Sequence, residues 1–248
     1  MSIQETNLKA IADAIRAKTG ETGTIKASEF ASKIAAISTG VAEAEWVLST
    51  LPTSTEWRSV CYGDGKFVAV SCSNISAYST DGINWIQATM PETKNWSSVC
   101  YGNGKFVAVV NGGQNCAYSS DGINWTQATM PSNHAWMSVC YGNGKFMAVT
   151  ASDDNVAAYS TNGINWTRVT LPVSSNWFSV SYGNGKFIAV PFSSTIAAYS
   201  TDGINWTQTT MPETRVWASV CYGDGKFVAV TRNSDIAAYI KDYFNSWA

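Results

Sequence analysis

The sequence predicts an all-β fold made of five copies of one unit, preceded by a short α-helical hairpin. Tryptophan recurs at spacings of 39, 40, 41 and 40 residues, in the order Trp57, Trp96, Trp136, Trp177 and Trp217. Five copies share the run W-x-S-V-C-Y-G-[ND]-G-K-F-x-A-V, with Ser181 in place of the cysteine in the fourth, and the first four also share A-Y-S-x-[DN]-G-I-N-W. Each unit carries turn signals between short apolar segments, and no helical periodicity follows residue 40. Such a repeat is typical of a five-bladed β-propeller of four-stranded antiparallel blades, expected over residues 41–248.

Four short strands fit in each copy. Gly63-Asp64-Gly65 and Asp81-Gly82 are hairpin signals, since these residues accept positive φ angles in tight turns. Pro91 ends the last strand because it has no N–H to donate to a sheet. In the first copy the expected strands are Ser59–Tyr62, Lys66–Val70, Ile75–Ser79 and Asn84–Thr89.

The two ends of the repeat region suggest how the ring closes. Residues 46–52 match the last strand of a blade but have no blade before them, whereas the fifth copy departs from the repeat after Tyr239. We therefore expect residues 46–52 to pair with Ile236–Tyr239 and complete the last blade, which would remove open strand edges. The alternative is that Phe244–Ala248 forms the missing strand itself.

Residues 1–40 have a different character. Leu8, Ile11, Ala12 and Ile15 follow the spacing of one helix face, and Gly20 fits a helix C-cap. A second helix is expected to carry Phe30, Ile34 and Ile37. Two helices of this length bury too little surface to be stable alone. We therefore expect them to pack on the propeller, on the same helices of other copies of the chain, or on a larger assembly.

The turn S-T-D-G-I-N-W, found at Ser79 to Trp85 and in three later copies, has a local role. Its short polar side chains accept hydrogen bonds from backbone N–H groups, while the tryptophan packs between blades. The motif resembles the Asp-box of sialidase-like propellers, although one residue between Asp and Gly is missing and Asn162 replaces Asp in the third copy.

The N-terminal run L-K-A-I-A-D-A-I-R-A-K-T-G, followed by I-K-A-S-E-F-A-S-K-I, resembles a short module of bacteriophage tail and fibre proteins. The resemblance implies that residues 1–40 attach the chain to other virion proteins or form a homo-oligomer. It also implies a location on the virion surface, tail or fibre. The N-terminus lacks the pattern of a secretory signal peptide, so synthesis in the host cytoplasm is expected.

Composition excludes several classes of function. Only 14% of residues are charged and the net charge is -2, which makes a nucleic-acid partner a poor expectation. No apolar run is long enough to insert into a membrane. Cys61, Cys100, Cys140 and Cys221 occupy one repeat position and are expected to be small buried side chains rather than bridges. No spacing predicts a metal site or a cofactor.

An enzyme is not expected, and no catalytic residue is proposed. A sialidase-like site needs an arginine cluster, a tyrosine nucleophile and acidic partners, but the arginines of the repeats lie at non-equivalent positions. The recurrent acids are explained by hairpin turns, while glycosidases in general need two facing carboxyl groups. A lone histidine in a variable loop, His134, is more typical of a surface residue than of a base.

Variation between the copies collects on one face. The connections between strands two and three, and between one blade and the next, differ from copy to copy, and both lie at the same end of the blades. Loops on a rigid scaffold commonly bind ligands, although drift alone also explains their variety. The expected site combines aromatic walls with polar partners: Trp57, Trp96, Trp136, Trp177, Trp217, Glu92, Asn95, His134, Asn176 and Arg215. Burial of these tryptophans between blades is an equally open alternative.

The favoured function is therefore a phage receptor-binding or adhesion protein with lectin-like recognition of cell-surface or mucus carbohydrate. Two other classes stay open, namely a structural virion decoration or spacer and a glycan-cleaving, sialidase-like enzyme. The ligand-binding hypothesis predicts weak individual sites and attachment through many copies on one particle.

Overall fold

The computed structural model describes residues 11–17, 22–26, 29, 46–232 and 234–241, and divides the chain after Leu48 into two units. In the first unit residues 11–17 are helical, and Ala12, Ile15 and Ile25 form a small buried cluster. Arg16 pairs with Asp13 and donates to the carbonyl of Gly23. The expected second helix, with Phe30, Ile34 and Ile37, lies outside the described residues, as does Leu8.

The second unit confirms the all-β prediction. It consists of five antiparallel sheets in chain order, four of them with four strands, and the fifth with three among the described residues. The first two sheets contain β1 Trp57–Gly63, β2 Lys66–Ser71, β3 Ile75–Ser79, β4 Ile86–Thr89, β5 Trp96–Gly102, β6 Lys105–Val110, β7 Asn115–Ser119 and β8 Thr126–Thr129. The others contain β9 Trp136–Gly142, β10 Lys145–Thr150, β11 Asp154–Ser160, β12 Thr167–Ser175, β13 Trp177–Gly183, β14 Lys186–Pro191, β15 Ser194–Ser200, β16 Thr207–Arg215, β17 Trp217–Gly223, β18 Lys226–Thr231 and β19 Ala237–Lys241.

The first hairpin of every blade forms as the sequence predicts. In blade one, Asp64 and Gly65 have φ angles of 47° and 71°, and Gly63 pairs with Lys66 across the turn. Two consecutive positive φ angles match the twist of the strands on either side, so the turn sets the register of the hairpin. Equivalent Asn-Gly or Asp-Gly pairs have the same geometry in the other four blades.

The second hairpin uses the side chains of the S-x-D-G-I-N-W turn. The hydroxyl of Ser79 accepts from the N–H of Gly82 at 2.9 Å, and Asp81 accepts from the N–H groups of Ile83 and Asn84 at 2.8 Å each. Asn162 makes the same backbone contacts in blade three at 2.9 Å. The motif therefore acts as a structural turn in all four complete blades.

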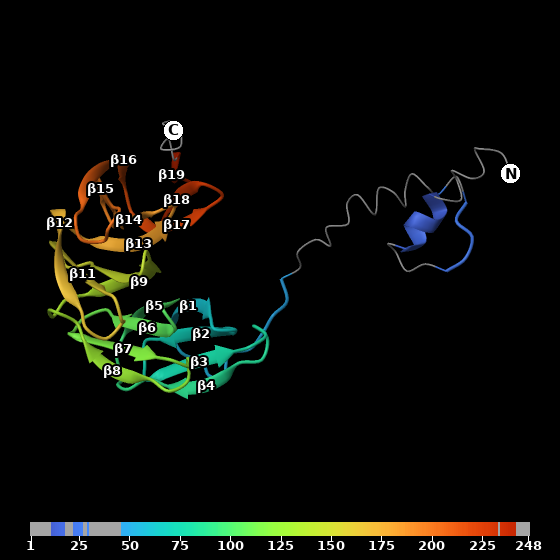
Figure 1. The fold of residues 1–248 in the computed structure, drawn as a ribbon, viewed down its shortest axis with the longest axis horizontal. Helices are drawn as coiled ribbons and strands as arrows, with labels where there is room; N and C mark the ends of the chain where they lie inside the picture. Colours follow the sequence, from blue (N-terminus) through green and yellow to red (C-terminus); the bar gives the residue numbers. More distant parts are fainter. Residues whose placement is uncertain (1–10, 18–21, 27–28, 30–45, 233, 242–248) are drawn as a thin grey trace. The chain divides into compact units, whose positions relative to one another are not determined.

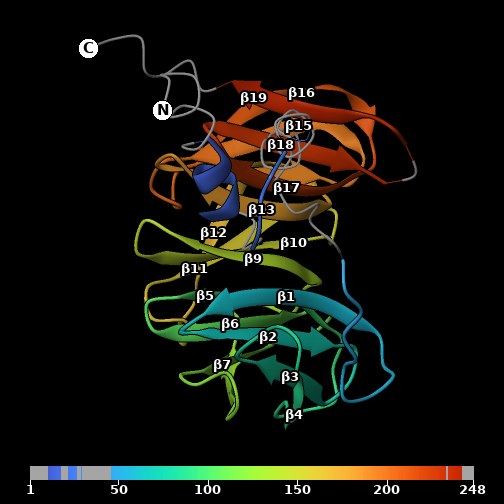
Figure 2. The same cartoon turned by 90° about the vertical axis from the view of Figure 1, so that its right-hand side faces the viewer.

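The blades stand side by side through their first strands, with β1 beside β5, β5 beside β9, β9 beside β13 and β13 beside β17 (Figure 1). An apolar cluster fills each of the four interfaces. Figure 2 shows the same sequence of first strands from the side, with β1 and β17 at opposite ends. The five blades form an arc whose first and last members do not meet.

The structure corrects the expected ring closure. Residues 49–52 form no strand, and the hydroxyl of Ser49 donates to the carbonyl of Ile83 in blade one rather than pairing with blade five. The fifth sheet ends at β19 among the described residues. Residues 49–52 pack against the first blade because its face there is apolar and uncovered, so burial competes with strand pairing for this segment. The alternative strand, Phe244–Ala248, lies outside the described residues.

Candidate functional site

The loops between the second and third strands share one face of the propeller with the loops that join the blades. In each blade the first residue of one loop donates its N–H to a carbonyl of the other, as Asn111 does to Asn95 at 2.8 Å. The equivalent bonds run from Cys72 to Glu56, Ala151 to Ala135, Phe192 to Asn176 and Arg232 to Val216, at 2.7–2.9 Å. The loop face is therefore a repeated, hydrogen-bonded platform.

A cavity of about 290 Å³ opens on this loop face, where the first strands of the five blades converge. Side chains from all five blades line it, so no single repeat could form it alone. The lining residues are Arg58, Asn95, Ser97, Ser98, Asn111, Met137, Ser138, Phe178, Ser179, Ala218 and Ser219. Two loop amides, several hydroxyls and two larger apolar groups thus surround one space.

The side chains that line the cavity differ from blade to blade because the residue after the repeated tryptophan varies. This position holds arginine, serine, methionine, phenylalanine and alanine in successive blades, in the order Arg58, Ser97, Met137, Phe178 and Ala218. The serine after it is constant and has a structural role, since Ser59 accepts the N–H of Val99 in the next blade at 3.1 Å. A constant scaffold therefore presents five different side chains to the cavity.

A hydrogen-bonded chain fixes the polar side of the cavity. The guanidinium of Arg58 lies 2.6 Å from a carboxylate oxygen of Glu56, and its Nε lies 2.9 Å from the sulfur of Cys72. The thiol of Cys72 in turn donates to the side-chain carbonyl of Asn95 at 2.9 Å. Arg58 is therefore already paired with a carboxylate near it in the chain.

Phe178, which lines the apolar side of the cavity with Met137, packs against Phe192 behind it. The ring centroids of Phe178 and Phe192 are 5.2 Å apart and the rings are tilted by 47°. Such tilted pairs are favourable because the positive edge of one ring meets the negative face of the other. Phe178 is half-buried and its exposed part lines the cavity.

The tryptophans that the sequence suggested as ligand walls have another role. Trp96, Trp136, Trp177 and Trp217 have no exposed surface, because each lies in an apolar cluster between two blades. The indole N–H of Trp96 donates to the carbonyl of Glu92 at 3.2 Å, and Trp57, Trp136 and Trp177 make the equivalent bond. Burial was one of the two alternatives, and it holds for these four residues.

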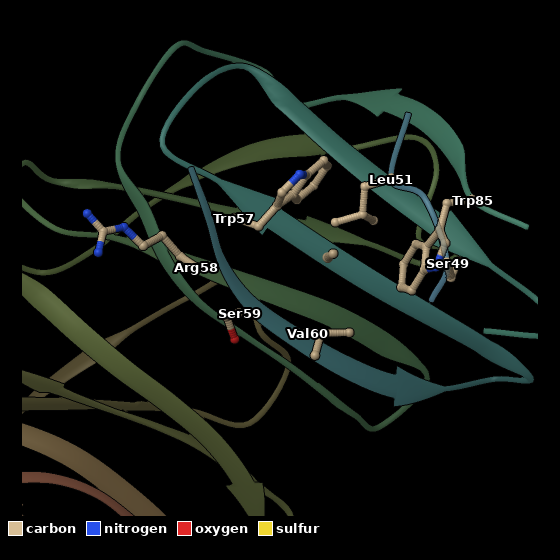
Figure 3. Close-up of a pocket in the computed structure, with 8 residues that line it drawn as sticks. Ser49, Leu51, Trp57, Arg58, Ser59, Val60 and Trp85 are labelled. Carbon is tan, nitrogen blue, oxygen red and sulfur yellow. The ribbon is translucent and has the colours of Figure 1, made fainter. Parts of the chain in front are cut away.

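Trp57 differs because no blade precedes it. It is half-buried and lines a groove of about 440 Å³ on the side of blade one that faces away from blade two. Leu51, Val60 and Trp85 line the same groove (Figure 3). Arg58, next to Trp57 in the chain, also lines the groove, and its guanidinium extends away from Leu51 and Trp85 (Figure 3). The groove lies at the blade-one end of the arc, and Arg58 lines both this groove and the central cavity.

The polar residues suggested from the sequence are divided. Asn95 lines the cavity, whereas the other four are paired with neighbouring residues of the loops or of the adjoining strand ends. Glu92 accepts from Asn115 at 3.2 Å and lies 3.4 Å from the ammonium of Lys94. The remaining contacts are His134 with Asp154 at 2.8 Å, Asn176 with the N–H of Asp153 at 2.9 Å and Arg215 with Glu213 at 3.0 Å.

Sequence reasoning missed Arg58, Met137 and Phe178. The signal was available, since the position after each tryptophan varies between copies while its neighbours stay constant. Within the described part of the chain, no group of three or more His, Cys, Asp or Glu residues is placed to hold a metal ion. The described helix is too short and too polar to cross a membrane.

Comparison with known proteins identifies the class of fold. Residues 49–173 match the family model described as the DUF6242 beta propeller domain. This match spans half of the chain, so the protein belongs to the DUF6242 beta propeller domain family. A search of curated proteins gave no match.

Several solved structures resemble this one. Virginiamycin B lyase from Staphylococcus aureus is 14% identical with a TM-score of 0.63, covering 77% of this chain and 71% of the lyase. YCF48 bound to D1 peptide is 12% identical with a TM-score of 0.64, covering 82% and 68%. A chain of a nidogen/laminin complex is 7% identical with a TM-score of 0.61, covering 75% and 76%. At these identities the likeness shows the propeller fold alone.

Proposed function

We propose that the propeller is a carbohydrate-binding module and that a sugar residue occupies the central cavity of the loop face. The supporting observation is the composition of the cavity lining. The ring of Phe178 offers an apolar wall, and the amides of Asn95 and Asn111 offer both donors and acceptors. Sugars present an apolar face and a rim of hydroxyls, which matches one aromatic wall with a few convergent polar groups.

The volume and charge of the cavity limit the classes of ligand that it could bind. About 290 Å³ is at the small end of ligand sites, and it suits one monosaccharide unit of a longer glycan. Arg58 is paired with Glu56 at 2.6 Å, so it is not a free cation awaiting a carboxylate. We therefore propose a neutral sugar rather than a sialic acid.

Binding is favoured over cleavage by the same lining. Glycoside hydrolysis in most families needs two carboxyl groups across the scissile bond. The described residues that line the cavity include arginine, asparagine, serine, alanine, methionine and phenylalanine, but no aspartate or glutamate. The site has the groups to hold a sugar without the pair of acids that would cut it.

The biological setting remains part of this proposal. The resemblance of residues 1–40 to a phage attachment module suggests that they anchor the propeller to other virion proteins. Many copies on one particle would raise the effective concentration of weak sites and allow adhesion to a cell-surface or mucus glycan. A structural spacer is the competing function.

A glycan array with the full chain tests the proposal. We expect retention of neutral glycans by the unmodified protein and at least a tenfold loss for Phe178→Ala. Ile83→Ala is the matched control, because it removes an exposed apolar side chain from a turn outside the cavity and should bind normally. If the unmodified protein retained no glycan, the spacer function would be favoured instead. Equal binding by Phe178→Ala would place any site elsewhere.

A further inference from the structure

The blades at the two ends of the arc each expose a face whose equivalents in the other blades are buried against a neighbouring blade. Val99, Val139, Val180 and Val220 face the preceding blade and are 4–6% exposed. Val60 holds the same position in blade one, where no blade precedes it, and is 59% exposed. Tyr62, on the same strand, is 60% exposed. The outer side of blade one is therefore an interblade face without its partner.

The far end of the arc shows the opposite half of the same interface. Val70, Val109, Val149 and Val190 face the following blade and are 0–1% exposed. Val230 holds this position in blade five and is 45% exposed. Cys221 is exposed as well, whereas Cys61 and Cys100 pack into or against interblade clusters.

A contact between tyrosine and glycine shows that the two ends are complementary. The ring of Tyr101 lies against Gly63 of the preceding blade, and a Cβ on this glycine would fall 2.0 Å from the tyrosine Cγ. Three further pairs repeat the contact at 1.9–2.0 Å, namely Gly102 with Tyr141, Gly142 with Tyr182 and Gly183 with Tyr222. Gly223 has no atom within 4 Å of such a Cβ. Blade five thus presents the glycine and blade one presents Tyr62.

Residues 49–52 lie where the last strand of a preceding blade would contact blade one. Leu51 lies in the groove beside Trp57 and Val60 (Figure 3). Its repeat equivalents are Met90, Met130, Leu171 and Met211. The first two directly follow the last strand of a blade and the other two lie within it, and each joins an interblade cluster with the tryptophan of the next blade. The blade that fills the groove would be one that lacks its own last strand, as blade five does among the described residues.

We propose that the uncovered side of blade one binds the fifth blade of a second copy of this chain. Tyr62 would cover Gly223 of the second copy, and residues 49–52 would lie along its β19. The interface reproduces the four that the chain already forms internally, so its packing is known from within the same molecule.

A second copy fits better than closure within one chain. The four internal interfaces are closely packed, with tryptophans that have no exposed surface and with Tyr–Gly contacts that admit no added carbon. Bringing blade five onto blade one of the same arc would rotate all four, and close-packed interfaces resist such changes. Association of two copies leaves them intact.

The contact is of the head-to-tail kind, because it joins two different surfaces. Each copy offers one end of each type, so such an interface builds either a closed ring or an open assembly. In both cases the mass should rise with concentration above that of a single copy.

Light scattering on the full chain tests this interface through Gly223→Gln. This glycine is exposed, has open space around it and does not have a positive φ angle, so the variant should fold normally. We expect the unmodified chain to gain mass with concentration and Gly223→Gln to need at least tenfold more protein for the same gain. Thr201→Gln, at an exposed turn away from both ends, is the matched control and should behave as the unmodified chain. A monomer at every concentration, or no difference between the two variants, would overturn the proposal.

A photo-cross-link identifies the partner surface even if association also occurs elsewhere. Benzoylphenylalanine at position 62 would be activated in a mixture of ¹⁴N- and ¹⁵N-labelled chains, and the linked peptides analysed by mass spectrometry. Links from position 62 to the peptide of β17 between differently labelled chains would support the interface. Links confined to a single label would show closure within one chain and refute the proposal, as would links to other peptides only.

Discussion

The aromatic ring of Tyr182 lies directly on the backbone of Gly142 in the preceding blade, with no room for a side chain between them. A Cβ on Gly142 would come within 1.9 Å of the tyrosine Cγ. The contact recurs at each of the four interfaces, so one small residue per blade sets how closely the next blade approaches. The glycine is required here for space and not for its φ angle, which is not positive.

This relationship predicts a difference between equivalent glycines. Gly142→Ala should lower the free energy of unfolding by about 1–3 kcal/mol, the usual cost of overpacking a close contact. Gly223→Ala should change it by less than about 0.5 kcal/mol in dilute solution, because nothing lies near that position. Urea unfolding at low protein concentration measures both, and equal effects would contradict the open arc.

The burial of the tryptophans predicts that replacing one inside the arc lowers stability more than replacing the one at its uncovered end. Trp136→Ala removes a side chain with no exposed surface and should cost about 3–5 kcal/mol. Trp57→Ala should cost less, since Trp57 is half-buried at the uncovered end. Thermal melts of the two variants provide the comparison. A larger loss for Trp57 than for Trp136 would mean that blade one is covered in the isolated chain.

The aspartate turns predict a loss of stability in acid. Hydrogen bonds from the backbone N–H and then the side-chain amide of Asn84 hold the pKa of Asp81 well below its usual range, and those from Asn205 and Ile204 do the same for Asp202. A lowered pKa in the folded state stabilises the fold at pH values above the unfolded pKa of about 3.9. This contribution is lost as the pH falls from there towards the folded value.

Asn162 supplies the matched test of that acid sensitivity. It accepts the same two backbone bonds at 2.9 Å but has no carboxyl group to protonate. The double variant Asp81→Asn, Asp202→Asn should lose less stability between pH 7 and pH 3 than the unmodified chain, whereas Asn162→Asp should lose more. Chemical unfolding at the two pH values checks both directions.

The cysteines predict an order of reaction with thiol reagents. Burial raises the pKa of the Cys61 and Cys116 thiols to about 12, and burial raises those of Cys100 and Cys140 as well. Cys221 is exposed at the open end of blade five and should be labelled first at pH 8 in dilute protein. Peptide mapping after short exposure to a maleimide gives the order. Slower labelling of Cys221 at high concentration would agree with head-to-tail association.

Much of the fold followed from local sequence signals. The Asp-Gly and Asn-Gly pairs require positive φ angles that few other residues adopt, and they placed the first hairpin of each blade correctly. The S-x-D-G-I-N-W turn likewise depends on groups within a few residues of one another, as the bonds to Asp81 show. Repetition then predicted the five sheets without any knowledge of their packing.

The site and the ends of the arc were decided by tertiary structure. Whether Trp136 would face a ligand or a neighbouring blade depends on the approach of that blade, which a single repeat does not contain. Phe178 and Arg58 come together only because first strands from different blades converge on one cavity. Residues 49–52 have the sequence of a last strand, yet they pack on blade one because an uncovered apolar face lies there. Local hydrogen bonding could be predicted from the sequence, whereas long-range burial depended on how the blades are arranged in space.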